Sequence, residues 1–258
     1  MDRPHDLAGA TEAFHRDGFV ILPSALPPAA AEHLRVLVEQ HFQDPQVHAA
    51  DPERDLVRGD VSLMRMFEHD QAFRDVITAE PLATLVESIL GPDCHVISQN
   101  ALRIPPGGGI ANWHIDDTLF FPFLDGAGAP RENIPCFALN MMVALSGIEH
   151  EQYGPTQVVP RSHLSGRRPP YSPDLPGEPR SLLARAGDVY LVNSQTWHRG
   201  APNRSGRTRY VLTTAYGRRF ISQRFYPFIG YRLPEGVLEG ASNRLARFLG
   251  QHGKGPYG

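Results

Sequence analysis

The spacing of apolar residues changes near Pro92, and this change restricts the folds open to the chain. Apolar positions recur at helical intervals before it, whereas short apolar stretches alternate with turn residues after it. Helices followed by many strands predict a mainly β, α+β architecture in which N-terminal helices buttress a double-sheet jelly roll. Residues 1–258 are expected to form one domain, because a chain of this length commonly folds as a single β unit.

The sequence also predicts where the elements lie. The expected helices are Ala8–Asp17, Pro27–Phe42, Asp70–Leu90 with a break at Pro81, and Pro234–Leu249. The expected strands are Gly18–Leu22, Cys94–Ile104, Asn112–Asp116, Ile134–Leu145, Thr156–Val159, Asp188–Val192 and Arg209–Tyr216. Asp44–Asp60 is polar and aperiodic, which predicts a mobile loop, and the Pro-rich Arg168–Arg180 is expected to be a surface insertion.

Charge and cysteine content argue against several classes of protein. A formal net charge of -3 does not favour nucleic acid as a partner. Cys94 and Cys136 are too few for a disulfide framework and lack zinc-ligand spacing, which fits a reducing compartment. The first residues lack an apolar leader and no run of about 18 apolar residues occurs. We therefore expect a cytoplasmic protein that needs no membrane; the sequence does not indicate its oligomeric state.

The segment Trp113–Asp117 places an imidazole near a carboxylate. Alternate side chains of an extended strand share a face, so His114 and Asp116 can reach one metal ion. A second histidine would complete the two-His, one-carboxylate set that suits non-haem Fe(II) with open positions. The alternative is a hydrogen-bonded surface or turn pair, which arises often by chance.

His198 is the candidate for the third ligand. It ends the apolar run that begins at Asp188 and lies 198 − 116 = 82 residues beyond Asp116, so only a fold that brings distant strands together can use it. A jelly roll does so. The alternative is a histidine whose ring is satisfied by its own backbone neighbours.

Arg209 opens an otherwise apolar strand, on the face shared by Val211, Thr213 and Ala215. An inward guanidinium costs several kcal/mol unless it meets an anion. A carboxylate-bearing cosubstrate would supply that anion through bidentate hydrogen bonds. The alternative is an outward Arg209 paired with a surface acid.

Two amides interrupt apolar strands. Asn140 lies in Ile134–Leu145, the most apolar stretch, and Gln99 lies in the strand before the metal pair. A buried amide needs partners, which a ligand or bound water can provide. A structural hydrogen bond to a neighbouring strand explains either amide equally well.

Taken together, these motifs resemble the phytanoyl-CoA dioxygenase family of Fe(II)/2-oxoglutarate-dependent oxygenases. The segments that carry the resemblance are Phe14–Leu22, Trp113–Asp117, Leu119–Phe123, Gly154–His163 and Gly187–Arg209. The resemblance implies a double-stranded β-helix of the cupin type, with His114, Asp116 and His198 as iron ligands. It also implies that Arg209 anchors the distal carboxylate of 2-oxoglutarate.

The reaction implied is hydroxylation, or a related oxidation, of an unactivated C–H bond of a small molecule, with release of succinate and carbon dioxide. Asp116 is intact, whereas the related halogenases replace this carboxylate. Gly200 departs from the family, which often has a hydroxyl residue there to help bind the cosubstrate, and Arg161 stands where a turn glycine is common. The rest of the cosubstrate shell is therefore open, with Gln99, Asn140 and Thr156 as candidates.

The substrate pocket is only hinted at. Phe120, Phe121 and Phe123 can wall an apolar pocket, or belong to the core. The arginines that can meet an anionic group, or lie solvated at the surface, are Arg58, Arg65 and Arg103. An acyl-CoA, an amino acid and a natural-product scaffold all stay open as substrates.

Two other functions use the same residues. A cupin-like metal hydrolase or isomerase would need the three ligands but no cosubstrate, and so no buried Arg209. A non-catalytic family member would bind a ligand without chemistry, but it has no reason to retain all three ligands.

Overall fold

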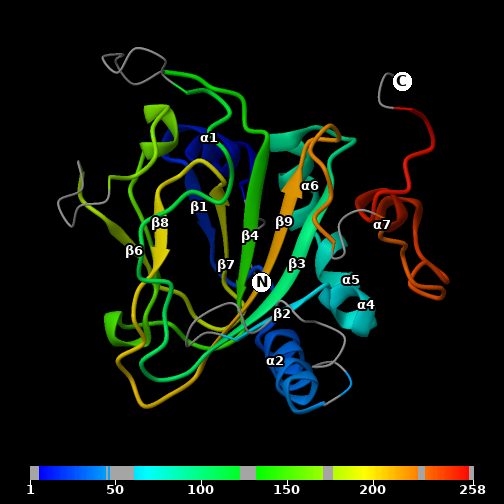
Figure 1. Ribbon diagram of the computed structural model, residues 1–258, viewed down its shortest axis with the longest axis horizontal. Helices are drawn as coiled ribbons and strands as arrows, with labels where there is room; N and C mark the ends of the chain where they lie inside the picture. The colour runs from blue at the N-terminus through cyan, green and yellow to red at the C-terminus, as the bar shows by residue number, and fades with distance from the viewer. Residues whose placement is uncertain are drawn as a thin grey trace.

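The computed structural model describes residues 6–44, 46, 61–122, 132–170, 177–225 and 230–255. Two antiparallel sheets dominate it (Figure 1). The larger sheet has the strand order β1-β7-β4-β9-β3-β2 and the smaller one the order β6-β5-β8. The strands are β1 Phe19–Leu22, β2 Val61–Met64, β3 His95–Ile104, β4 Ala138–Ala144, β5 Thr156–Val158, β6 Arg180–Leu182, β7 Val189–Asn193, β8 His198–Gly200 and β9 Arg209–Gly217.

The helices lie on one side of the larger sheet and the smaller sheet on the other (Figure 1). They are α1 Leu7–Asp17, α2 Pro28–Gln43, α4 Met66–His69, α5 Gln71–Thr78, α6 Leu82–Leu90 and α7 Asn243–Phe248, with 3-10 turns at Glu151–Tyr153 and Ser162–Ser165. Within the described part of the chain, no helix combines the length and the apolar character needed to cross a membrane.

Strand β4 shows how the larger sheet divides the interior. Leu139, Met141 and Val143 belong to the apolar core that the helices cover. Met142 and Ala144 belong to a second cluster, which lies between the two sheets. Because side chains alternate along a strand, residue parity decides whether a position faces the helices or the space between the sheets.

Local signals explain where the first helix begins and ends. The side chain of Asp6 accepts a hydrogen bond from the Gly9 N–H at the N-terminus of α1, and Phe14 buries the apolar face of the helix. Gly18 ends it with φ +85°, and its N–H donates to the Phe14 carbonyl. A Cβ on Gly18 would lie 2.5 Å from both His163 Nδ1 and Thr196 Oγ1, so only glycine fits this turn.

Most expected elements are present. The expected helix Asp70–Leu90 is divided into α5 and α6, as the break at Pro81 indicated. The C-terminal helix is restricted to α7, because Gly236 and Gly240 adopt positive φ angles of 89° and 69° that turn the preceding chain. Strands β2, β6 and β8 were not expected, and each has only three or four residues, which is too short for a clear alternating pattern. Most of Asp44–Asp60 lies outside the described residues.

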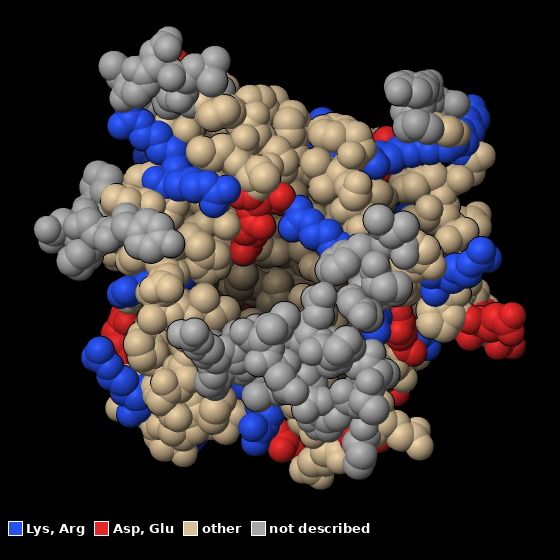
Figure 2. Space-filling model, in the orientation of Figure 1, with Lys and Arg blue, Asp and Glu red and all other residues tan. Residues whose placement is uncertain are grey.

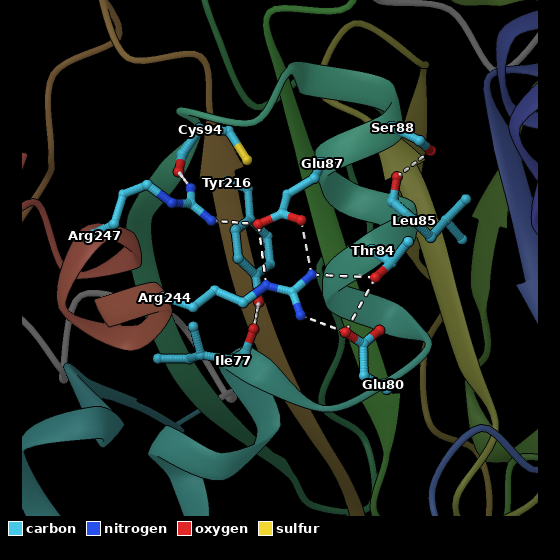
Figure 3. A network of polar contacts seen from close by, with 10 residues as sticks. All are labelled: Ile77, Glu80, Thr84, Leu85, Glu87, Ser88, Cys94, Tyr216, Arg244 and Arg247. Carbon is cyan, nitrogen blue, oxygen red and sulfur yellow. Dashed lines mark hydrogen bonds and ion pairs between the residues drawn. The ribbon is translucent and has the colours of Figure 1, made fainter. Parts of the chain in front are cut away.

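Helix α7 is fastened to α6 by a network of ion pairs (Figure 3). Glu87 accepts hydrogen bonds from Arg244 Nη2 at 2.7 Å, from Arg244 Nε at 3.1 Å, and from Arg247. Arg244 also binds Glu80, whose side chain is 55% exposed, whereas that of Glu87 is 22% exposed. Exposure separates the two pairs, because solvent weakens the interaction of exposed charges.

Glu87→Gln is expected to lower the free energy of unfolding by about 1–2 kcal/mol, since it weakens bonds from two partly buried guanidinium groups. Urea unfolding followed by circular dichroism measures the change. Glu80→Gln is the matched control, and its exposed pair should contribute less than about 1 kcal/mol. Equal losses for the two variants would show that partial burial does not strengthen the Glu87 pairs.

Candidate metal centre

His114, Asp116 and His198 converge in the structure. Their donor atoms all lie within 4.8 Å of one another. Asp116 Oδ1 is 3.6 Å from His114 Nε2, and Asp116 Oδ2 is 3.3 Å from His198 Nε2. Two imidazole nitrogens and a carboxylate therefore surround one point, which is the donor set expected for a non-haem iron site.

The backbone brings these residues together in a way that differs from the expected strand Asn112–Asp116. Only His114 of that segment forms a β-bridge, and its partner is His198. Each of the two residues donates its N–H to the carbonyl of the other at 3.0 Å, while the Asp116 N–H turns to the Ser194 carbonyl at 3.1 Å. The Asp116 bond is not part of a β-ladder, so within Asn112–Asp116 only His114 pairs with another strand. His198 likewise opens the separate strand β8, after a turn that follows β7.

Hydrogen bonds to the backbone also orient both imidazole rings. His114 Nδ1 is 2.8 Å from the Asn112 carbonyl, and His198 Nδ1 is 2.8 Å from the Thr196 carbonyl. A carbonyl only accepts hydrogen bonds, so Nδ1 carries the proton in each neutral ring. The lone pair of Nε2 then faces the shared centre in both residues, which is how a metal-binding histidine is prepared.

The charges of the three groups are coupled. Enclosure by protein would raise the pKa of Asp116, but the charge of His198 and its hydrogen bond lower it overall. Burial would lower the pKa of His198, but the negative charge of Asp116 raises it. Burial and the nearby His198 lower the pKa of His114. The centre thus favours an ionised Asp116 carboxylate and a neutral His114 ring, which are the forms that bind a metal.

Asn140 on β4 holds the carboxylate of this centre. Its Nδ2 donates to Asp116 Oδ2, and its side chain is buried with 7% exposure. The amide was expected to contact a ligand or another strand. The structure assigns it a different partner, a member of the triad, and it also lines the adjacent pocket.

Asn140→Ala is expected to weaken Fe(II) binding by about 10–100-fold, because loss of a hydrogen bond that orients a metal-binding side chain has an effect of this size. Anaerobic titration of Fe(II) into the protein measures it. Met142→Leu is the matched control, since Met142 lines the same pocket from β4 without contacting the triad through a hydrogen bond. Unchanged Fe(II) affinity in Asn140→Ala would show that Asp116 keeps its orientation unaided.

The three side chains lie at a pocket of about 270 Å³ that both sheets line. Figure 2 shows a hollow on this face of the molecule with acidic and basic side chains at its rim. The larger sheet contributes alternate positions of β3, β4 and β9, and the smaller sheet contributes β5 and β8. The pocket therefore occupies the space between the sheets, on the face away from the helices.

Arg209 lies inside this pocket with 4% exposure, which excludes the outward alternative. Gly200 faces it, and a Cβ there would lie 3.3 Å from Arg209 Nη2 and 3.3 Å from the Ile110 nitrogen. Glycine thus makes room for the guanidinium. Thr156, which pairs with Gly200, also lines the pocket, and its Oγ1 is 3.2 Å from the hydroxyl of Tyr190.

Comparisons with known proteins identify the family. The family model described as "Phytanoyl-CoA dioxygenase (PhyH)" matches residues 14–211, which is most of the chain. The chain belongs to the phytanoyl-CoA dioxygenase family. The family expected from the sequence motifs is therefore confirmed.

Among curated proteins, the ectoine dioxygenase of Stutzerimonas stutzeri (strain A1501) is 25% identical over 171 residues. The match covers 60% of this chain and 50% of that protein, so the chain spans half the length of this relative.

Two solved structures show the same fold. HygX from Streptomyces hygroscopicus, with nickel, 2-oxoglutarate and hygromycin B bound, has a TM-score of 0.66 at 15% identity, covering 87% of this chain and 95% of that one. The non-haem alpha-ketoglutarate-dependent carbocyclase SnoK from nogalamycin biosynthesis has a TM-score of 0.66 at 18% identity, covering 93% and 94%. The expected jelly-roll fold with flanking helices is confirmed.

Two expected site residues lie on the other face of β3. Gln99 Nε2 donates to the Phe73 carbonyl at 2.9 Å and to Thr214 Oγ1 at 3.3 Å, which is the structural alternative left open for this amide. Arg103 pairs with Glu39 of α2 at 3.0 Å. Both side chains occupy odd positions of the strand and face the helices, so neither lines the described pocket.

The aromatic residues are also displaced from the expected pocket. Phe120 and Phe121 pack against Phe137, with ring centroids 5.4 Å and 5.0 Å away, and do not line the described cavity. Arg65 pairs with Glu68 at 3.1 Å. Arg58 and Phe123 lie outside the described residues. Arg161, at the turn where this family often has glycine, adopts the left-handed conformation with φ 64°.

The even positions of β3 supply a pocket residue that sequence reasoning missed. Asn100 pairs with Thr213 of β9, and both line the cavity. Asn100 Oδ1 and Thr213 Oγ1 are buried without a hydrogen-bond partner among the described residues. The sequence already places Thr213 on the face of Arg209. Asn100 could be placed at the pocket only from the strand register, which pairs it with Thr213. The sequence does not specify that register.

Proposed function

We propose that the chain is an Fe(II)- and 2-oxoglutarate-dependent oxygenase that hydroxylates, or otherwise oxidises, an unactivated C–H bond of a small molecule. One observation carries the proposal: the two-histidine, one-carboxylate group and the buried Arg209 line one pocket. Membership of the phytanoyl-CoA dioxygenase family supports it. For hydroxylation, substrate, 2-oxoglutarate and dioxygen would give the alcohol, succinate and carbon dioxide.

The residues fit iron. His114 and His198 present Nε2 and Asp116 presents carboxylate oxygen, a donor set that suits Fe(II) and leaves positions open on the side of the pocket. When bound, iron supplies the activation of dioxygen that couples oxidation of 2-oxoglutarate to oxidation of the substrate. A reducing compartment such as the cytoplasm, supported by the two buried free thiols, would keep the iron ferrous.

The pocket also suits the cosubstrate. Arg209 is placed to bind the distal carboxylate of 2-oxoglutarate through its guanidinium in the pocket. Asn100, Thr156 and Thr213 offer polar groups to the remaining oxygens. In such a cavity the bound substrate is oriented and shielded from water while oxidation proceeds.

The buried cation separates this function from its competitors. A cupin-like hydrolase or isomerase has no use for Arg209 in the same pocket as the triad, and a non-catalytic member needs no intact triad. SnoK is a carbocyclase, so one fold supports more than one oxidative outcome. Hydroxylation or a related oxidation is proposed, and halogenation is not, because Asp116 is retained as the carboxylate of the triad.

The test is a visible absorption spectrum. Under anaerobic conditions, Fe(II) and 2-oxoglutarate together should give a metal-to-ligand charge-transfer band that neither gives alone. Succinate release under air, screened over acyl-CoAs, amino acids and polyketide or terpenoid scaffolds, then identifies the substrate class. A protein that binds Fe(II) but shows no band with 2-oxoglutarate would contradict the proposal and favour a function without a cosubstrate.

A further inference from the structure

Arg224 lines the same pocket but takes no part in the triad or in the proposed cosubstrate site. Its backbone N–H donates to the Ile97 carbonyl at 2.8 Å, at the point where the register of β3 is interrupted. Its Nη2 donates to Asp117 Oδ1 at 2.6 Å. The backbone and the carboxylate thus fix a guanidinium that keeps 40% exposure at the pocket.

Within the described residues, Asp117 is the only side chain that hydrogen-bonds this guanidinium. An arginine has five N–H donors in a rigid planar fork, and the bond to Asp117 uses one of them. The other donors can bind an oxyanion in the pocket. The Asp117 side chain is 11% exposed and does not line the described pocket, so it restrains Arg224 from outside the cavity.

The strand register places the backbone attachments of Arg209 and Arg224 near opposite ends of β9, which lines the pocket. Arg209 pairs with Ile104, whereas Ala215, six residues further along β9, pairs with Ser98 next to the Arg224 attachment. Six strand residues span roughly 20 Å. Asn140, which binds Asp116, pairs with Ala215, so the triad lies towards the Arg224 end. A five-carbon diacid that reaches from Arg209 to the triad leaves Arg224 unused.

The balance of charge favours an anion in this pocket. The charged side chains that line the pocket are Asp116, Arg199, Arg209 and Arg224. The formal charges of a divalent metal, the dianionic cosubstrate, Asp116 and Arg209 sum to zero. The negative charge of Asp117 likewise offsets the positive charge of Arg224. Arg199 remains, with its Nε bonded to Gln157 at 2.8 Å and its guanidinium 4.7 Å from the Trp113 ring centroid. A pocket with excess positive charge attracts anions.

We infer that the primary substrate carries an oxyanion, a carboxylate or a phosphate, that binds to Arg224 beside the metal centre. This inference rests on the proposed function and gives its substrate class. Arg224 is then the residue that sets specificity and orientation: it holds the anionic end of the substrate and presents a nearby C–H bond to the triad. Neutral or cationic analogues of the same size lack the group that the guanidinium recognises.

The test is calorimetric binding of matched probes to the anaerobic protein loaded with Fe(II) and 2-oxoglutarate. The carboxylate probes are hexanoate and phenylacetate, each compared with its neutral amide, and the phosphate probe is benzyl phosphate, compared with benzyl alcohol. At least one anion should bind about tenfold or more tightly than its neutral partner. Tighter binding of only the carboxylates, or of only the phosphate, than of their neutral partners supports the inference. It also shows which of the two oxyanions the substrate carries.

Variants assign the preference to Arg224. Arg224→Gln should remove it, and so should Asp117→Asn/Arg224→Gln, in which no buried carboxylate is left unpaired. Asp117→Asn alone should retain it, which separates recognition of the anion from disruption of the ion pair. Absence of any preference in the wild-type protein, persistence of the preference in both variants that lack Arg224, or its loss in Asp117→Asn would overturn the inference.

The charge-transfer band, recorded on the same samples, distinguishes this failure from failure of the proposed function. A band without a preference for anions contradicts the role of Arg224 alone. A preference for anions without a band contradicts the oxygenase assignment, and the inference about its substrate then fails with it.

Discussion

His198→Ala should abolish the charge-transfer band of the anaerobic protein with Fe(II) and 2-oxoglutarate, and should reduce succinate release to background. His198 is one of only three side chains in the described centre, and its Nε2 faces the point that His114 and Asp116 share. Loss of one of three donors leaves too few groups to hold Fe(II) at this site. Absorption spectra recorded during Fe(II) titration measure the effect.

His33→Ala is the control for this experiment, because His33 is exposed on α2. Its band and its turnover should match those of the wild-type protein. Circular dichroism would show that both variants are folded. A band of full strength in His198→Ala would exclude His198 as a metal ligand, and with it the proposed donor set.

Arg209→Ala should raise the 2-oxoglutarate requirement roughly 100- to 4000-fold, because removing one member of a desolvated charge pair costs about 3–5 kcal/mol. The requirement for Fe(II) should change far less, since Arg209 is not one of the three donor residues and its guanidinium instead faces Gly200 of β8. Titrating each component in turn, with the band as the readout, separates the two effects.

Arg103→Ala is the matched control, since Arg103 lies one strand away, opposite Tyr210, and pairs with Glu39 on the helix side. It should leave the 2-oxoglutarate requirement unchanged while altering stability by an amount typical of a partly exposed ion pair. Unchanged 2-oxoglutarate affinity in Arg209→Ala would rule out the anchor role and would return the cupin-like hydrolase to consideration.

The residue types of the centre and the pocket face of β9 could be predicted from the sequence, whereas the faces of β3 could not. His114, Asp116 and His198 were candidates because their side chains match a two-histidine, one-carboxylate donor set, and the structure brings them together. Gln99 and Arg103 were misplaced and Asn100 was missed, although all three belong to β3. A shift of one residue moves every side chain of a strand to its other face, and both faces of this strand are largely covered, so apolar spacing did not reveal the parity.

Residues outside regular strands were harder to assign. Arg224 follows β9 in an irregular segment, and its backbone bond to Ile97 and its ion pair with Asp117 place it at the pocket. Asn140 was recognised as a buried amide that needs a partner, but the sequence did not show that the partner is Asp116. Such contacts join segments far apart in the chain, and no local pattern records them.

The reciprocal main-chain bonds between His114 and His198 make the centre largely independent of its ion. Two of the three donors are joined by peptide groups that never touch the metal, and Asn140 secures the third. We therefore expect the chelating groups to assemble when the polypeptide folds. The cation would then bind to them without being needed to bring them together. Chelators should thus extract it reversibly, leaving a vacant but intact receptor that reloads without refolding.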